Sequence, residues 1–182
     1  MADNTAASYL DEAFRAFRGY KRMADGALSQ LDDKEFFHVP DAESNSVALI
    51  VKHVAGNLRS RWTDFLTSDG EKPDRQRDTE FVQPPATRAE LMELWEEGWD
   101  CVWRALGPLN ESDLAHTVTI RGENHSVTQA INRQLAHYAY HIGQIVLLAK
   151  HFRSEQWKSL TVPKNKSAEF NQKVAAGEKS QR

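Results

Sequence analysis

The sequence SVTQAINRQLAHYAYHIGQIVLLAKH, residues 126–151, sets the architecture of this chain. It opens with a capping box, Ser126-x-x-Gln129, whose two side chains satisfy free backbone N–H groups at the start of a helix. Its apolar residues then recur at intervals of three and four, the period of one helix face. They are Ile131, Leu135, Tyr138, Ile142 and Ile145, with Ala149 continuing the stripe. The sequence therefore predicts one long helix with a face directed into a core.

Three further segments share this periodicity. The first spans about residues 5–31. The second starts among Ser44–Ser46, which are good N-cap residues, and is expected to end near residues 68–70. The third opens with a capping box at Thr87 and stops at the breaker pair Gly107–Pro108. Four helices around one core predict an all-α fold, a four-helix bundle.

Two connections between these helices differ from short loops. Residues 71–85 are charged, contain three prolines and are long for a bundle, and long loops in compact domains are often functional or mobile. Thr117–Ile120 is made of residues that favour strands, and residues 121–124 are typical of a turn. We therefore expect a short hairpin before the last helix.

The composition is that of one globular domain. The chain has 182 residues, of which 40% are hydrophobic and 27% are charged, so it can bury a sizeable core. We expect a single metal-binding domain over residues 1–160. Residues 161–182 are polar and predict a mobile tail, in which Phe170 is a candidate anchor.

The same bulk numbers exclude several classes of protein. The net charge is -3 and no basic cluster is present, so a nucleic-acid partner is not expected. No stretch approaches the roughly 18 apolar residues of a membrane span, and the polar residues 1–8 do not resemble a secretory signal. The single cysteine, Cys101, excludes an internal disulfide framework. These features together predict a cytoplasmic protein.

Two histidines on the last helix carry the strongest chemical signal. His137 and His141 are four residues apart and so lie one turn apart on the same face, where two imidazoles can hold one metal ion. Such a pair also recurs by chance in helical proteins. At about 100° per residue, both lie on a flank of the core stripe, and His53 lies on the matching flank of the second helix. Periodicity leaves open whether these flanks meet across a cleft.

The other four histidines lack the spacing to a ligand partner. They are His38, His116, His125 and His151. His38 and His125 lie in polar loops, and His151 closes the last helix, where a cation suits the helix dipole. We expect none of the four to bind the metal.

Other polar candidates have two interpretations each. Arg59 and Arg61 follow His53 and can either bind an anionic substrate or pair with the acidic loop at residues 69–78. Cys101 has no evident basic neighbour, which favours a buried inert thiol over a nucleophile.

Trp95, Trp99 and Trp103 recur every four residues of the third helix and widen its apolar face. They can belong to the core or to a dimer surface. We expect exposed indoles at the margin of this face and, with the general prevalence of dimers, a homodimer.

Two motifs resemble those of the DinB/YfiT-like family of metalloenzymes. They are Asn45-Ser46-x-x-Leu49-x-x-x-His53-x-x-Gly56-Asn57 and His137-x-x-Tyr140-His141-x-Gly143-Gln144. The runs Arg61–Leu66 and Asp69–Pro73 further resemble an uncharacterised subgroup known by a domain-of-unknown-function label. The resemblance covers about residues 5–155.

This resemblance implies an up-down four-helix bundle with a three-histidine site, which falls here on His53, His137 and His141. Zinc or nickel is the usual ion, and relatives include thiol-S-transferases and isomerases that use low-molecular-weight thiols. Three protein ligands leave a fourth position open, and a metal there makes a nucleophile of a bound water or thiol. Gln144 and Asn57 are candidates to support the ligands or the substrate, unless they cap local backbone or face solvent.

We therefore expect a divalent-metal-dependent enzyme that acts on a small molecule, as a thiol-dependent transferase or as a hydrolase. The alternative is a metal- or ligand-binding stress-response bundle without turnover. A third, weaker interpretation is a helical interaction module with incidental histidines.

Overall fold

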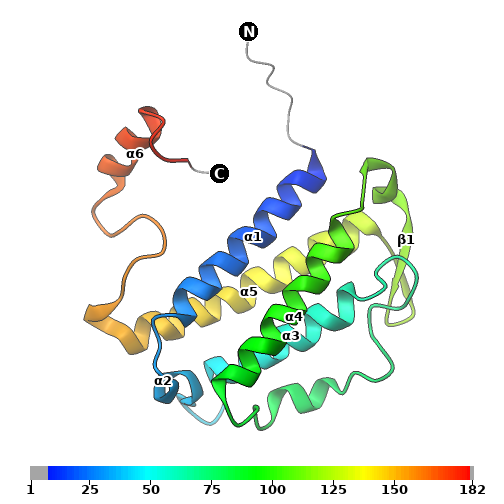
Figure 1. Ribbon diagram of the computed structural model, residues 1–182, viewed down its shortest axis with the longest axis horizontal. Helices are drawn as coiled ribbons and strands as arrows, with labels where there is room; N and C mark the ends of the chain where they lie inside the picture. The colour runs from blue at the N-terminus through cyan, green and yellow to red at the C-terminus, as the bar shows by residue number, and fades with distance from the viewer. Residues whose placement is uncertain (1–7, 181–182) are drawn as a thin grey trace.

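The computed structural model describes residues 8–180, and 63% of these residues lie in helices. Within this range it forms six α-helices, three short 3-10 helices and one two-stranded sheet (Figure 1). In chain order the elements are α1 Tyr9–Leu28, α2 Asp33–Phe37, α3 Val47–Trp62, η1 Arg77–Phe81, α4 Arg88–Leu106, η2 Glu111–Ala115, β1 Thr117–Ile120, β2 Glu123–Ser126, α5 Val127–Arg153, η3 Ser154–Gln156 and α6 Ser167–Ala175.

Four long helices, α1, α3, α4 and α5, lie alongside one another and share the core (Figure 1). α3 packs against α4 and α5, and α1 packs against α5. The core is aromatic at its centre, where the Phe17 ring centroid lies 5.5 Å from that of Trp62 and 5.9 Å from that of Tyr138. Trp62 Nε1 donates to the Tyr138 hydroxyl at 3.0 Å, so the polar ends of these buried rings satisfy one another.

The predicted helix starts are confirmed where the structure describes them. Ser46, Thr87 and Ser126 are N-caps, and each accepts a hydrogen bond from a backbone N–H in the first turn. Each such cap contributes about 1 kcal/mol to stability. The first helix begins at Tyr9 behind the N-cap Ser8, and the start predicted near residue 5 lies outside the described residues.

Two helix predictions are wrong. The second helix ends at Trp62 and not near residues 68–70, because Thr63 is extended and Asp64 adopts a left-handed conformation with φ 49°. Gly70 N then donates to Thr119 O at 2.8 Å, which ties the chain to the hairpin. The short helix α2 is not among the four predicted helices, although a capping box with Asp32 as N-cap opens it.

The predicted hairpin is present with a tighter turn than expected. Thr117 pairs with Ser126 and Ile120 with Glu123, so β2 begins within the stretch assigned to the turn. Only Arg121 and Gly122 remain between the strands, with φ 55° and 76°. Two consecutive positive φ values are typical of the type I′ turn that matches the twist of paired strands.

The segment after the last long helix, which was predicted to be a mobile tail, contains the short helix α6. This helix lies apart from the four long helices in Figure 1. No residue of α6 is buried. Nearer to α5, Leu160 packs so closely on Gly26 that a Cβ there would lie 2.8 Å from Leu160 Cδ2.

The tryptophans of α4 do not form an exposed patch. Trp95 and Trp99 are fully buried, and the Trp99 ring lies 5.8 Å from Tyr138 and 5.5 Å from Trp103. Trp103 in turn lies 5.2 Å from Phe14 of α1. Trp95 and Trp99 are therefore covered within the chain and not exposed, and the homodimer stays a prediction. Among the described residues no helix has the length and apolarity to cross a membrane.

Candidate metal centre

Three histidines from two helices converge at one point between α3 and α5. The ring centroid of His53 lies 4.8 Å from that of His141 and 5.4 Å from that of His137. The two α5 rings lie 4.6 Å apart. One nitrogen from each ring lies within 4.8 Å of the other two, close enough to hold a metal ion. The flank of α3 that carries His53 therefore does meet the flank of α5 that carries His137 and His141.

A buried polar network beside the histidines fixes α3 against α5. Asn57 Oδ1 accepts from Gln134 Nε2 at 2.7 Å and from the Tyr138 hydroxyl at 3.1 Å. Asn57 lies one turn after His53, and Gln134 lies about one turn before His137, so the network sets the separation of the histidine-bearing turns. Asn57 is 3% exposed and thus joins the two helices, a role that neither sequence interpretation assigned to it.

Two of the three imidazoles are oriented by acceptors at Nδ1. His53 Nδ1 donates to Glu80 Oε2 at 2.7 Å, and His141 Nδ1 donates to Gln144 Oε1 at 2.8 Å. With the proton held on Nδ1, the lone pair resides on Nε2. Carboxylates and amide oxygens commonly fix metal-binding histidines in this way. Gln144 therefore contacts a candidate ligand, as one of the two sequence interpretations predicted.

The third imidazole leaves a buried nitrogen without a partner. His137 Nε2 is buried and has no hydrogen bond among the described residues. Buried polar atoms in folded proteins normally have a hydrogen-bond partner or a metal ion. The His137 Nε2 atom has no such partner among the described residues, which is what an unfilled metal ligand would show. A metal ion shared with His53 and His141 fits that requirement, because neutral imidazole nitrogen suits zinc and nickel.

The environment holds these rings in the neutral form that binds metals. Burial, followed by the proximity of His141 and His53, lowers the pKa of His137 to about 3. Burial also lowers the pKa of His141, although its hydrogen bond to Gln144 works in the opposite direction. Both rings are therefore uncharged at neutral pH, and no proton has to leave before an ion binds.

Glu80 is a site residue that periodicity could not identify. It belongs to η1, inside the charged stretch 71–85, and is 7% exposed. Arg75 donates to it from Nε at 2.8 Å and from Nη2 at 2.9 Å. Burial alone would raise the pKa of Glu80, but the hydrogen bonds from His53 and Arg75 hold it below its usual value. Glu80 is therefore an ionised acceptor for the His53 proton.

Two further contacts hold η1 over His53. The Phe81 ring centroid lies 4.5 Å from that of His53. Lys52, the neighbour of His53 in sequence, donates from Nζ to the backbone carbonyls of Thr79, Val82 and Gln83. A cation on three carbonyls fixes the end of η1 to α3.

Gly56 explains how η1 comes so close. A Cβ at this position would lie 2.5 Å from Glu80 Oε1 and 2.9 Å from its Cδ. A side chain there would thus push the carboxylate away from α3. Gly56 follows His53 by three residues, so the histidine and the gap for its acceptor lie on one face of the helix.

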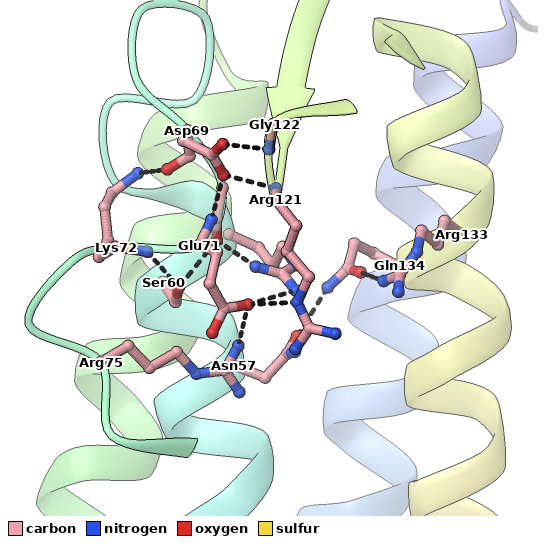
Figure 2. A network of polar contacts seen from close by, with 12 residues as sticks. Asn57, Ser60, Asp69, Glu71, Lys72, Arg75, Arg121, Gly122, Arg133 and Gln134 are labelled. Atoms are coloured by element: carbon pink, nitrogen blue, oxygen red, sulfur yellow. Dashed lines mark hydrogen bonds and ion pairs between the residues drawn. The ribbon is translucent and has the colours of Figure 1, made fainter. Parts of the chain in front are cut away.

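Figure 2 shows how the network continues from Arg75 to the hairpin. Glu71 Oε2 accepts from Arg61 at 2.9 Å, from Arg75 at 3.3 Å and from Arg121 at 3.0 Å. Asp69 accepts from the N–H groups of Arg121 and Gly122, both at 2.8 Å, and so closes the hairpin turn.

These contacts decide between the two interpretations of the α3 arginines. Arg61 is 3% exposed and its guanidinium is directed at Glu71, so it pairs with the acidic loop. Arg59 lies 3.7 Å from Asp74, where both side chains are largely exposed. The acidic-loop interpretation is confirmed for Arg61, which is buried away from solvent.

The remaining candidates lie outside the centre. Among residues 8–180, the three-histidine set is the metal-capable group, and the other histidines do not contribute to it. His116 Nδ1 lies 3.4 Å from Asp113, and the His38 ring lies 5.4 Å from Phe152. Cys101 is buried, with Arg104 Nη2 3.4 Å from its sulfur, so a basic group that sequence inspection missed is present.

A family model described as "Protein of unknown function (DUF1572)" matches residues 4–166. The chain belongs to this family. The matched range holds the four long helices, η1 and the hairpin, and therefore every residue of the candidate centre. A comparison with curated proteins gives no match. The description of DUF1572 names no reaction, so the chemistry has to be argued from the site.

Proposed function

We propose that this DUF1572 protein is a divalent-metal-dependent enzyme of the DinB/YfiT-like type. The DUF1572 family lies in the DinB/YfiT-like superfamily. We assign α1, α3, α4 and α5 as the up-down four-helix bundle of that superfamily, and His53, His137 and His141 as its metal ligands. Zinc or nickel is the ion that this ligand set favours.

The observation that carries the proposal is the state of the three imidazoles. Two have Nδ1 hydrogen-bonded to fixed acceptors, the third has an unpartnered buried nitrogen, and all three converge. Glu80 and Gln144 hold the Nδ1 protons of two rings, which leaves the Nε2 lone pairs of those rings for an ion. Among the described residues the group has three members, and such a set leaves a coordination position open, as in catalytic sites.

A bound ion would supply a lowered pKa for a thiol or water and thus a nucleophile at neutral pH. The residues of the chain have supporting tasks. Glu80 keeps the proton of His53 on Nδ1, Gln144 does the same for His141, and Phe81 covers one face of the His53 ring. We infer a thiol-dependent S-transferase, or a related small-molecule transferase or hydrolase. Cys101 lies outside the centre, so no protein nucleophile is assigned.

The test has two stages. Protein purified without chelator is assayed for metal content, and about one zinc or nickel ion per chain is expected. The loaded protein is then incubated with low-molecular-weight thiols and electrophilic acceptors, and thiol consumption above the chelated control is expected. Metal binding without turnover would favour the non-catalytic stress-response bundle. Absence of metal binding would leave the helical interaction module.

A further inference from the structure

Lys52 holds the chain on both sides of the two residues of η1 that contact His53. Those two residues are Glu80, through its carboxylate, and Phe81, through its ring. The Nζ atom of Lys52 donates to three backbone carbonyls around them, those of Thr79, Val82 and Gln83, the last two at 3.0 Å and 3.1 Å. Lys52 directly precedes His53 in α3, so neighbouring side chains of one helix bind the same short segment.

The carbonyls at the end of η1 cannot be satisfied by the two residues that follow Gln83. The last carbonyls of a helix lack the intrahelical N–H groups that satisfy the others. Pro84 and Pro85 come next in the chain, and proline has no backbone N–H to donate. The Lys52 ammonium therefore supplies the donors that the sequence directly after η1 lacks.

The ammonium of Lys52 is fully used by these contacts. It has three donor hydrogens, and three carbonyls accept from it. Among residues 8–180 no carboxylate oxygen lies within 4.0 Å of its Nζ atom. Lys52 therefore has no free donor for a substrate and no ion pair, and its polar contacts all lie at the end of η1.

η1 depends on such contacts because it is short. It has five residues, and its N-cap, Gln76, makes no side-chain cap. A 3-10 turn has poor hydrogen-bond geometry, and a helix of this length is not stable in water without tertiary contacts. Arg75, which precedes η1, holds the Glu80 carboxylate, and Lys52 holds the other end of the segment. The two cations thus fix η1 on both sides of the group that orients His53.

We propose that Lys52 is a positioning residue of the candidate metal centre. Through the backbone of η1 it keeps Glu80 at Nδ1 of His53, and so keeps the Nε2 lone pair of His53 available to the ion. The inference rests on the proposed function, because it concerns metal affinity, and it adds a residue that does not touch the ion. Charge alone predicts the opposite sign, because a nearby cation repels a divalent ion and its removal would tighten binding.

The test compares zinc binding by the full-length wild type and by Lys52→Met, which is similar in size and uncharged. Competition with a chromophoric chelator measures the affinity, and circular dichroism verifies folding. We expect Lys52→Met to bind zinc about three- to tenfold more weakly, a smaller loss than removal of the acceptor itself should cause. Lys52→Arg keeps donors for the carbonyls and should recover part of the affinity. Unchanged or tighter binding in Lys52→Met would overturn the role of Lys52, and Lys52→Gln gives the same comparison if Lys52→Met does not fold.

A double variant tests whether Lys52 acts through Glu80. In Glu80→Ala the contact that Lys52 supports is already absent, so adding Lys52→Met should cost less affinity than it costs in the wild type. Equal losses in both backgrounds would overturn this route.

Trypsin cleavage after Arg77 gives a readout in metal-free protein. The cleavage, followed by mass spectrometry, should be faster in Lys52→Met because η1 leaves α3 more often. An unchanged rate would show that Lys52 does not hold η1 and would overturn the proposal.

Lys21→Met is the matched control. Lys21 donates to Asp25 at 2.7 Å and to Glu96 at 2.8 Å, and so joins α1 to α4. Its substitution also removes a bound ammonium, but the zinc affinity and the cleavage after Arg77 should keep their wild-type values. An equal loss of affinity in Lys21→Met would overturn the assignment to Lys52. A wild type that binds no zinc would overturn the proposed function, and this role with it.

Discussion

His53 Nδ1 lies 2.7 Å from Glu80 Oε2, and this contact joins the histidine cluster to the long charged connection between α3 and α4. Both residues are almost fully buried. The pair ends a chain of charged groups that runs through Arg75 and Glu71 to the hairpin. Residues 71–81 thus contribute to the candidate centre.

The first prediction concerns the ligand set. His53→Ala, His137→Ala and His141→Ala should each lose most of the bound metal, because two imidazoles hold an ion far more weakly than three. The number of metal ions bound per chain is measured by mass spectrometry after desalting. His125→Ala is the matched control, since its side chain lies in β2 and outside the cluster. Full occupancy in any of the three variants would remove that histidine from the set.

The second prediction concerns Glu80. Glu80→Ala should weaken metal binding about 10- to 100-fold, because His53 loses the acceptor that orients its ring. Glu80→Gln keeps an acceptor oxygen without the charge and should restore part of the affinity. Competition with a chromophoric chelator measures both. Asp78→Asn removes a neighbouring but fully exposed carboxylate and should have no effect. Equal affinity in wild type and Glu80→Ala would show that the contact does not serve the metal.

Local sequence rules were enough for the parts of the structure that are set within one helix. The capping boxes at Thr87 and Ser126 and the spacing of His137 and His141 are such features. The meeting of His53 with the α5 histidines required tertiary packing. Glu80 could not be found because nothing in a 3-10 turn reveals the direction of its side chain.

Helix periodicity predicted the wrong end for the second helix, because contacts between distant segments determine where that helix ends. The apolar stripe of the second helix continues to Phe65, but the chain leaves the helix after Trp62. Gly70 binds the hairpin through Thr119, and Arg61 binds Glu71, so the helix end is set by partners elsewhere in the sequence. The α4 tryptophans were also misjudged for lack of tertiary information. A wide apolar face predicts that these side chains are buried, but it does not tell which other helices bury them.

The third prediction uses the gap at Gly56. Gly56→Ala places a methyl group 2.5 Å from Glu80 Oε1, which is closer than van der Waals contact allows, and the carboxylate is held in place by Arg75. We expect weaker metal binding, similar to Glu80→Ala, together with a loss of stability of about 1–3 kcal/mol. Urea unfolding and chelator competition measure the two effects.

The control for Gly56→Ala is another helical glycine. Gly19 in α1 has nothing within 4 Å of an added Cβ, so Gly19→Ala should stabilise the protein by up to about 1 kcal/mol. Its metal affinity should not change. If Gly56→Ala were also stabilising, Glu80 would have to be more mobile than its two bonds to Arg75 suggest.

The last prediction is a pH dependence of the metal-free protein. The pKa of His137 is lowered to about 3 from its usual value of 6.5, mainly by burial. A histidine with a lowered pKa binds its proton more readily in the unfolded chain, so acid favours unfolding. The stabilisation is complete above pH 6.5 and is lost as the pH falls toward 3, and His141 adds an effect of the same sign. We expect a decrease on the order of 1–3 kcal/mol from this source.

The measurement is urea unfolding of chelator-treated protein between pH 7 and pH 4. His137→Gln replaces the titrating ring by a neutral side chain and should flatten the curve in this window, since glutamine binds no proton. His151→Gln changes an exposed histidine at the end of α5 and should leave the slope as it is. Saturating zinc should make the free energy of unfolding fall more steeply as the pH decreases. An ion bound to the folded state adds stability by mass action, and this contribution is lost in acid because a protonated imidazole cannot bind the ion. A wild-type slope that persists in His137→Gln would assign the acid sensitivity to other groups.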